Sequence, residues 1–159
     1  MFSIFNSRKA VPVGDDERKE IMRLLEMAED TRHGAFLHLM DKSKLKFRWN
    51  PAMDVKNGVL GNFGMLRPNT IDLAPGPSPH SEGDYPFDRI LSLMPTIWHE
   101  LDHKFQLNEA PLSFLLDGLP LVREAPWSTE PDARAVEEAM EEFYSARRRD
   151  IEMSWRNGA

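Results

Sequence analysis

The amino-acid sequence predicts an α+β fold, in which several helices pack against a small antiparallel or mixed sheet. Near both ends of the chain, apolar residues recur every three or four positions, which is the spacing of one helix face. Between residues 45 and 49, apolar and charged residues alternate, as is typical of a half-buried strand. A third segment, around residues 90–106, is apolar at helical spacing and contains two histidines. We therefore expect a small sheet, with an edge strand ahead of the histidine-containing segment, that packs against several helices, including a long C-terminal one.

The size and composition of the chain indicate a single globular domain. Its 159 residues match the usual size of one domain, and a hydrophobic fraction of 41% with a charged fraction of 29% is ordinary for a soluble protein. We expect an extended N-terminal arm over residues 1–13, which is a candidate contact for a protein partner. The single domain is expected over residues 14–159.

Net charge, apolar segments and cysteine content indicate which kinds of partner, location and metal ligand to expect. The net charge of −6 argues against nucleic acid as a partner, because phosphate binding depends on clustered Lys and Arg. We find no secretory signal and no transmembrane stretch, so we expect a cytoplasmic protein without a membrane partner. Because the sequence contains no cysteine, His and carboxylate side chains are its only strong metal ligands.

Two helices are expected before the sheet. Asp15 or Asp16 is a suitable N-cap for a helix that runs to about residue 30. The apolar stripe of this helix consists of Ile21, Leu24, Leu25 and Ala28. Thr31 is a candidate cap for a second helix that runs to about residue 42.

The middle of the chain is expected to form three short strands and a loop. The first strand covers residues 44–49, and a turn at residues 57–58 leads to a kinked strand over residues 59–65. Residues 68–73 form the third strand, directly ahead of the histidine-containing helix. The loop over residues 74–86 is rich in proline and carries His80, which is a candidate contact for a metal site.

The segment from Pro95 to Gln106 contains the pattern H-E-x-x-H, formed by His99, Glu100 and His103. Residues four apart on a helix lie on the same face, so the two imidazoles can converge on one metal ion. Glu100 projects beside that point, where its carboxylate can take a proton from a metal-bound water. The pattern therefore predicts a site for one Zn²⁺ ion, and the alternative is a surface face of ion pairs. Pro95 either kinks this helix or starts a new one.

The last third of the chain is expected to supply the third metal ligand. A long helix is predicted from Glu130 to about Trp155, since apolar residues follow at steps of three and four. A carboxylate is well placed in the first turn of a helix, because the helix dipole favours negative charge there. Glu130 is therefore the expected ligand. Asp132 is the rival, and simple compensation of the helix dipole is the alternative for both residues.

These motifs resemble those of the zincin metallopeptidases of the gluzincin type, especially small members whose third ligand begins an E-x-x-A motif. The H-E-L-D-H of residues 99–103 is followed, 27 positions after His103, by E-P-D-A at residues 130–133. The resemblance covers roughly residues 65–145. It implies zinc held by His99, His103 and Glu130, with Glu100 as general base and acid in peptide hydrolysis. It also implies that residues 70–73 form an edge strand along which an extended peptide lies.

The sequence departs from this family pattern at two places. Many gluzincins carry an aspartate four residues after the ligand glutamate, where it orients a histidine, and this chain has Arg134 there. Candidate substitutes are Asp102, Asp117 and Asp132. A Tyr or His that stabilises the oxyanion is also not evident. The candidates for a contact to the transition state are His80, Arg123 and Tyr144.

The predicted function is zinc-dependent hydrolysis of peptide bonds in a peptide or protein substrate. The alternative is a catalytically weak or inactive zincin-like domain that serves as a structural or interaction component of a larger assembly. The lack of an evident oxyanion residue and the N-terminal arm motivate this alternative. Hydrolysis of a bond other than a peptide also stays open, because fold does not determine substrate.

Overall fold

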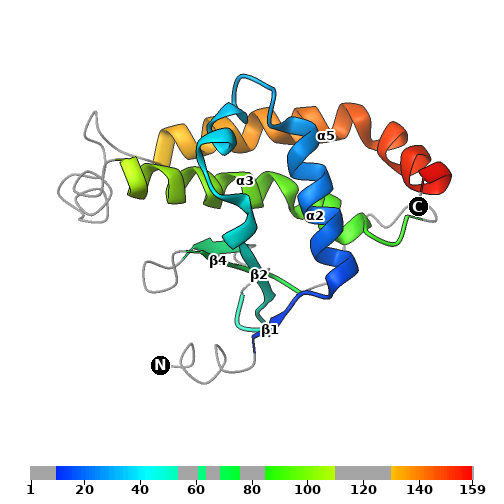
Figure 1. Ribbon diagram of the computed structural model, residues 1–159, viewed down its shortest axis with the longest axis horizontal. Coiled ribbons are helices and arrows are strands. Elements are labelled where there is room, and N and C mark those ends of the chain that lie inside the picture. Colours follow the sequence, from blue (N-terminus) through cyan, green and yellow to red (C-terminus); the bar gives the residue numbers. More distant parts are fainter. Residues whose placement is uncertain (1–9, 54–60, 64–68, 76–84, 110–129, 159) are drawn as a thin grey trace.

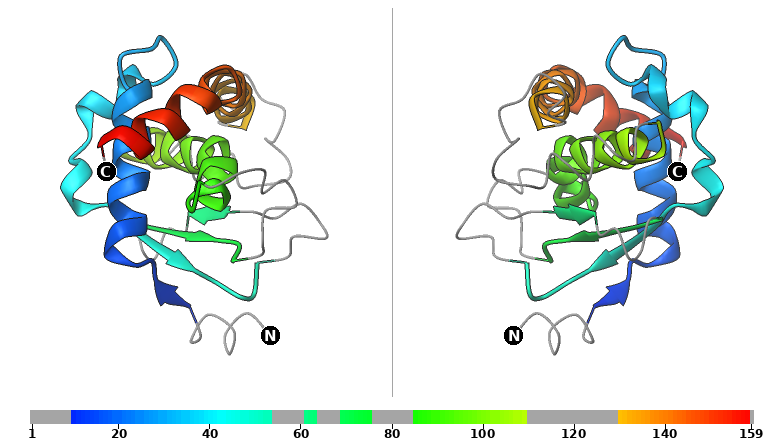
Figure 2. Two further views of the ribbon diagram at one scale, coloured as in Figure 1. Left: turned by 90° about the vertical axis from the view of Figure 1, so that its right-hand side faces the viewer. Right: turned by 90° about the vertical axis from the view of Figure 1, so that its left-hand side faces the viewer.

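The computed structural model describes residues 10–53, 61–63, 69–75, 85–109 and 130–158. For residues 61–63, 107–109, 130 and 131 it describes the backbone alone. The elements in chain order are β1 (Val11–Pro12), α2 (Asp15–Ala28), the 3₁₀ helices η1 (Ala35–Leu39) and η2 (Lys42–Lys44), β2 (Lys46–Trp49), β3 (Gly61–Phe63), β4 (Thr70–Leu73), α3 (Asp88–Glu109) and α5 (Glu130–Gly158). The predicted α+β class is confirmed, with the helices gathered on one side of a small sheet (Figures 1 and 2).

The sheet has four strands in the order β1-β2-β4-β3, and it is mixed. β2 and β4 are parallel, whereas β1 pairs antiparallel with β2 and β3 pairs antiparallel with β4. The alternation predicted for β2 is confirmed, because Phe47 and Trp49 are buried. On the opposite face, the Arg48 guanidinium donates two hydrogen bonds to the Asp72 carboxylate, at 2.8 and 2.9 Å. This bidentate pair ties β2 to β4.

The position expected for β4 at the edge of the sheet is wrong. β4 lies between β2 and β3, so both of its sides are paired, and the strands at the two edges of the described sheet are β1 and β3. The alternating residues Ile71 and Leu73 show only which face of β4 is buried. Which strands flank β4 depends on long-range pairing, which the residues of β4 alone do not encode.

Helix α2 confirms the first expected helix, with Ile21, Leu24, Leu25 and Ala28 buried. Its N-cap is Gly14 rather than Asp15 or Asp16, and the Glu17 carboxylate accepts a hydrogen bond from the Gly14 N–H at 2.9 Å. A carboxylate at this third position can satisfy the backbone N–H of the cap, so the helix starts with no capping side chain on the cap residue.

The helix expected over residues 31–42 is wrong, because only the short 3₁₀ helices η1 and η2 form there. The Thr31 hydroxyl donates to the Ala28 carbonyl at 2.6 Å, and the Asp41 carboxylate accepts from the Ser43 N–H at 3.1 Å. Such side-chain bonds to nearby backbone compete with a regular helix. The chain also passes so close to the end of α2 that a Cβ on Gly34 would lie 2.2 Å from the Ala28 carbonyl oxygen.

Helix α3 is the centre of the fold. It contacts α2, α5, η1, β3 and β4. It runs without interruption through Pro95, so of the two interpretations left open by the sequence, a new helix starting at the proline is wrong. It also continues to Glu109, beyond the segment that contains the H-E-x-x-H pattern. Within the described part of the chain, none of the helices combines the length and the apolar character that a membrane span requires.

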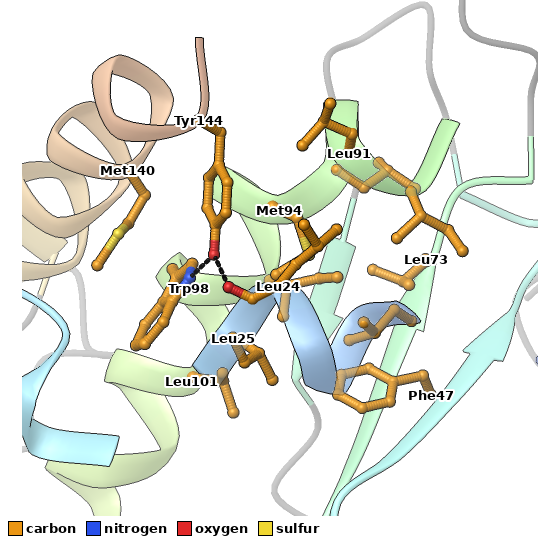
Figure 3. Packing of buried hydrophobic residues seen from close by; sticks show 14 of the residues in the cluster. Leu24, Leu25, Phe47, Leu73, Leu91, Met94, Trp98, Leu101, Met140 and Tyr144 are labelled. Atoms are coloured by element: carbon orange, nitrogen blue, oxygen red, sulfur yellow. Dashed lines mark hydrogen bonds between the residues drawn. The ribbon is translucent and has the colours of Figure 1, made fainter. Parts of the chain in front are cut away.

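Helix α5 lies beside α3 and runs antiparallel to it (Figure 1). Between them, Tyr144 and Trp98 are buried among apolar side chains of α2, α3 and the sheet (Figure 3). The Tyr144 hydroxyl donates to the Leu24 carbonyl at 2.6 Å and accepts from the Trp98 indole N–H at 2.9 Å. This pair of hydrogen bonds joins all three helices in the core.

The far end of the α3–α5 pair is held by an ion pair between Arg148 and Asp88. The Asp88 side chain is only 6% exposed, whereas that of Arg148 is 34% exposed. We expect Arg148→Met to lower the free energy of unfolding by roughly 2–3 kcal/mol. Loss of one partner of a fully buried pair costs about 3–5 kcal/mol, and solvent screening of Arg148 reduces this. Urea denaturation measures the change.

The neighbouring Arg149→Met is the control for this prediction. Arg149 is exposed on the same helix, so its replacement should change the free energy of unfolding by less than about 0.5 kcal/mol. Equal losses in the two variants would contradict a specific role for the Arg148 ion pair.

Candidate metal centre

The two histidines of the H-E-x-x-H pattern meet on α3. His99 and His103 lie one turn apart, and their ring centroids are 4.8 Å from each other. The Nε2 atoms of the two rings face each other at 3.1 Å. Both residues are half-buried, beside the fully buried Trp98 and Leu101. The convergence expected from helical spacing is therefore present.

The distance between the two nitrogens fits a shared zinc ion. Imidazole nitrogens bind zinc at about 2.0–2.1 Å in tetrahedral geometry, which puts two such nitrogens roughly 3.3 Å apart. The separation of 3.1 Å in this structure is close to that value. Neutral imidazole is also a preferred ligand of zinc, so both the geometry and the chemistry of this pair suit the ion.

Glu100 follows His99 on α3 and is half-buried. The side chain of a residue one position along a helix is rotated by about 100°. Helix geometry therefore predicts that Glu100 leaves the helix beside the pair of imidazoles instead of between them. This is the position in which a carboxylate can serve as a base without occupying the metal.

Acidic side chains surround the two histidines. Asp102 is buried and accepts a hydrogen bond from the Gln106 amide at 2.8 Å. Burial raises the pKa of Asp102 to about 6, the charge of Asp132 raises it as well, and His99 opposes the shift. The exposed Asp132, at the start of α5, thus lies close enough to influence Asp102.

The packing of α5 on α3 predicts that the first turn of α5 lies close to His103. The His99–Glu137 contact and the Asp88–Arg148 ion pair lie eleven residues apart on each helix, so the two helices keep a constant antiparallel register. Extending this register from His99 by four residues brings His103 level with residue 133. Glu130, the first residue of α5, is less than one turn away. Its side chain lies outside the described residues.

One residue of this site was missed in the sequence. The Glu137 carboxylate oxygen Oε2 lies 3.3 Å from His99 Nδ1. The family pattern places an orienting carboxylate four residues after Glu130, where this chain has Arg134, and the substitutes considered were Asp102, Asp117 and Asp132. Residues seven apart on a helix also share a face, so the spacing from Glu130 to Glu137 was the available signal.

The other residues predicted to orient a histidine or to contact the transition state lie in three kinds of place. Tyr144 does not serve as a transition-state contact, because its hydroxyl is buried and donates its proton to the Leu24 carbonyl. Asp102 accepts a hydrogen bond from Gln106. The carboxylate that lies against His99 Nδ1 is that of Glu137. The other candidates, His80, Asp117 and Arg123, lie outside the described residues.

Within the residues whose side chains are described, no group of three His, Asp or Glu is arranged to hold a metal ion. The described part of a site therefore consists of the His99–His103 pair with Glu100 and Glu137 around it. No family model, curated protein or solved structure matches this chain.

Proposed function

We propose that this chain is a zinc-dependent metallopeptidase of gluzincin type, in which His99, His103 and Glu130 hold one Zn²⁺ ion. One observation carries the proposal: the Nε2 atoms of two histidines face each other at 3.1 Å on a single helix, with Glu100 next to the first. A bound zinc ion supplies Lewis-acid chemistry, since it polarises a carbonyl and lowers the pKa of a water molecule. Two imidazoles and one carboxylate form a ligand set known from catalytic zinc.

Glu100 is the residue that moves the proton in this proposal. Its carboxylate takes a proton from the attacking water as the new C–O bond forms. It then gives the proton to the amine nitrogen as the C–N bond breaks. A positioned general base of this kind contributes roughly 10²–10⁴-fold to the rate. A half-buried carboxylate beside the imidazoles is suited to both steps.

The edge of the sheet supports an extended peptide as the substrate. β3 is one of the two edge strands of the described sheet, and it contacts α3, the helix that carries the histidines. Its outer side has no paired strand in the part of the chain that the structure describes. A peptide that adds to such an edge forms main-chain hydrogen bonds with little demand on its sequence. β3 thus takes the role that we expected of β4.

The second candidate function is a zincin-like domain without significant hydrolysis, which serves as a component of a larger assembly. The observation that favours it is Tyr144, whose hydroxyl is committed to the core and is not available to an oxyanion. In this case zinc would only fasten α5 to α3. A measurement of bound metal does not distinguish the two functions, because both bind zinc. A measurement of peptide hydrolysis does distinguish them.

The metal content of the purified protein tests the proposal. We expect about one zinc per chain by elemental analysis, and we expect His99→Ala and Glu130→Ala to lose it, because each removes a ligand. His38→Ala is the control, since His38 contacts Asp30 at 3.0 Å on an exposed surface. Absence of stoichiometric zinc in the wild-type protein would contradict the metallopeptidase, and it would equally contradict a structural domain held together by zinc.

A further inference from the structure

A contact between helices links the histidine pair to the middle of α5. His99 Nδ1 and Glu137 Oε2 lie 3.3 Å apart, although the residues are 38 positions apart in the sequence. The His99 side chain is 14% exposed and that of Glu137 is 37% exposed. The Glu137 carboxylate thus contacts one ring nitrogen of His99, Nδ1, while the other, Nε2, faces His103.

The chemistry of the two groups identifies the donor and the acceptor in the His99–Glu137 hydrogen bond. A carboxylate only accepts hydrogen bonds, so His99 Nδ1 must carry the hydrogen. In a neutral imidazole the other nitrogen, Nε2, then holds a lone pair. That lone pair is on the atom that faces His103 Nε2 at 3.1 Å. The contact thus favours the tautomer in which His99 can bind a metal through Nε2.

Glu137 has no competing role among the described residues. Its contact with His99 is the one hydrogen bond or ion pair that it makes there. The neighbouring Glu138 and Glu141 on the same helix are exposed and make no such contact within the described part of the chain. A glutamate on the surface of α5 is stable in water without a partner. The contact with His99 is therefore what distinguishes Glu137 from Glu138 and Glu141.

We propose that Glu137 is a positioning residue, which holds His99 in the Nδ1–H tautomer and so directs Nε2 to the metal position. The effect of Glu137 on zinc binding rests on the proposed function. The effect of Glu137 on the His99 tautomer does not. Partners of this kind raise metal affinity, and their loss typically weakens binding by about 10–100-fold. Here the partner stands two helical turns beyond Glu130 on the same face of α5.

The first test uses the metal-free protein. At about pH 8, where histidine is neutral, two-bond ¹H–¹⁵N NMR spectra report the tautomer of each ring. We expect His99 to be the Nδ1–H form in the wild type and to shift toward the Nε2–H form in Glu137→Ala, with Glu141→Ala unchanged. A wild-type Nε2–H form, or a spectrum unaffected by Glu137→Ala, would overturn the proposal. Circular dichroism checks that each variant is folded.

The second test measures zinc affinity by competition with a chromophoric chelator. Glu137→Ala should weaken binding by about 10–100-fold, and Glu137→Gln by less, because the amide oxygen can still accept from Nδ1. Glu141→Gln removes the same charge from the same helix and should change little. Equal losses in Glu137→Gln and Glu141→Gln would indicate a general charge effect and would overturn the positioning role. If the wild type binds no zinc, the proposed function fails, and the tautomer measurement alone decides on Glu137.

Discussion

Glu100→Gln is expected to keep the zinc ion bound and to lower the rate of peptide hydrolysis by about 10²–10⁴-fold. Glutamine has nearly the shape of glutamate, but its amide cannot take a proton from water. Because Glu100 is not one of the proposed ligands and follows His99 on the helix, we expect the metal ligands to stay in place. The measurements are kcat/KM on a peptide substrate found by digestion of a peptide library, and zinc content of the same preparation.

Glu26→Gln is the matched control for this change. Glu26 is exposed on α2 and makes no hydrogen bond or ion pair within the described residues, so its replacement should leave both readouts unchanged. Hydrolysis at the wild-type rate by Glu100→Gln would exclude Glu100 as the base. A wild-type protein that binds zinc but cleaves no peptide would instead favour the structural role, in which Glu100→Gln is silent.

Trp98→Ala is expected to lower the free energy of unfolding by about 3–5 kcal/mol, the usual cost of removing a large aromatic side chain from a core. Trp98 has no exposed surface, and its ring packs edge-on against Phe36 with centroids 5.7 Å apart. Its N–H also donates to the Tyr144 hydroxyl. Urea denaturation followed by circular dichroism measures the loss, with an unchanged m-value as the sign of two-state unfolding.

Two smaller changes separate packing from hydrogen bonding at this position. Trp98→Phe keeps an aromatic ring but loses the N–H donor, and Tyr144→Phe leaves the Trp98 N–H and the Leu24 carbonyl without their partner. We expect each to cost about 1–3 kcal/mol. We also expect Trp98→Phe to retain zinc, because Trp98 belongs to the core and not to the metal site. A loss below about 1 kcal/mol in Trp98→Ala would contradict this burial.

Much of the helical structure was predictable because it depends on local periodicity. The apolar stripe of α2 and the start of α5 at Glu130 appear in the structure where the sequence predicted them. The alternation over β2 likewise identified its buried face. In contrast, residues 31–42 have helix-compatible spacing but form 3₁₀ turns, since side-chain bonds to the backbone compete with the regular helix there.

By itself, the sequence determined that two imidazoles lie one turn apart on an amphipathic helix with a glutamate beside them. This follows because the helix repeat relates residues only four positions apart. Only the tertiary structure decided that β4 lies inside the sheet with β3 at the edge beside it, that Tyr144 belongs to the core, and that Glu137 contacts His99. These features depend on how α5, α3 and the strands pack, and they join residues up to 120 positions apart, for which local periodicity carries no information.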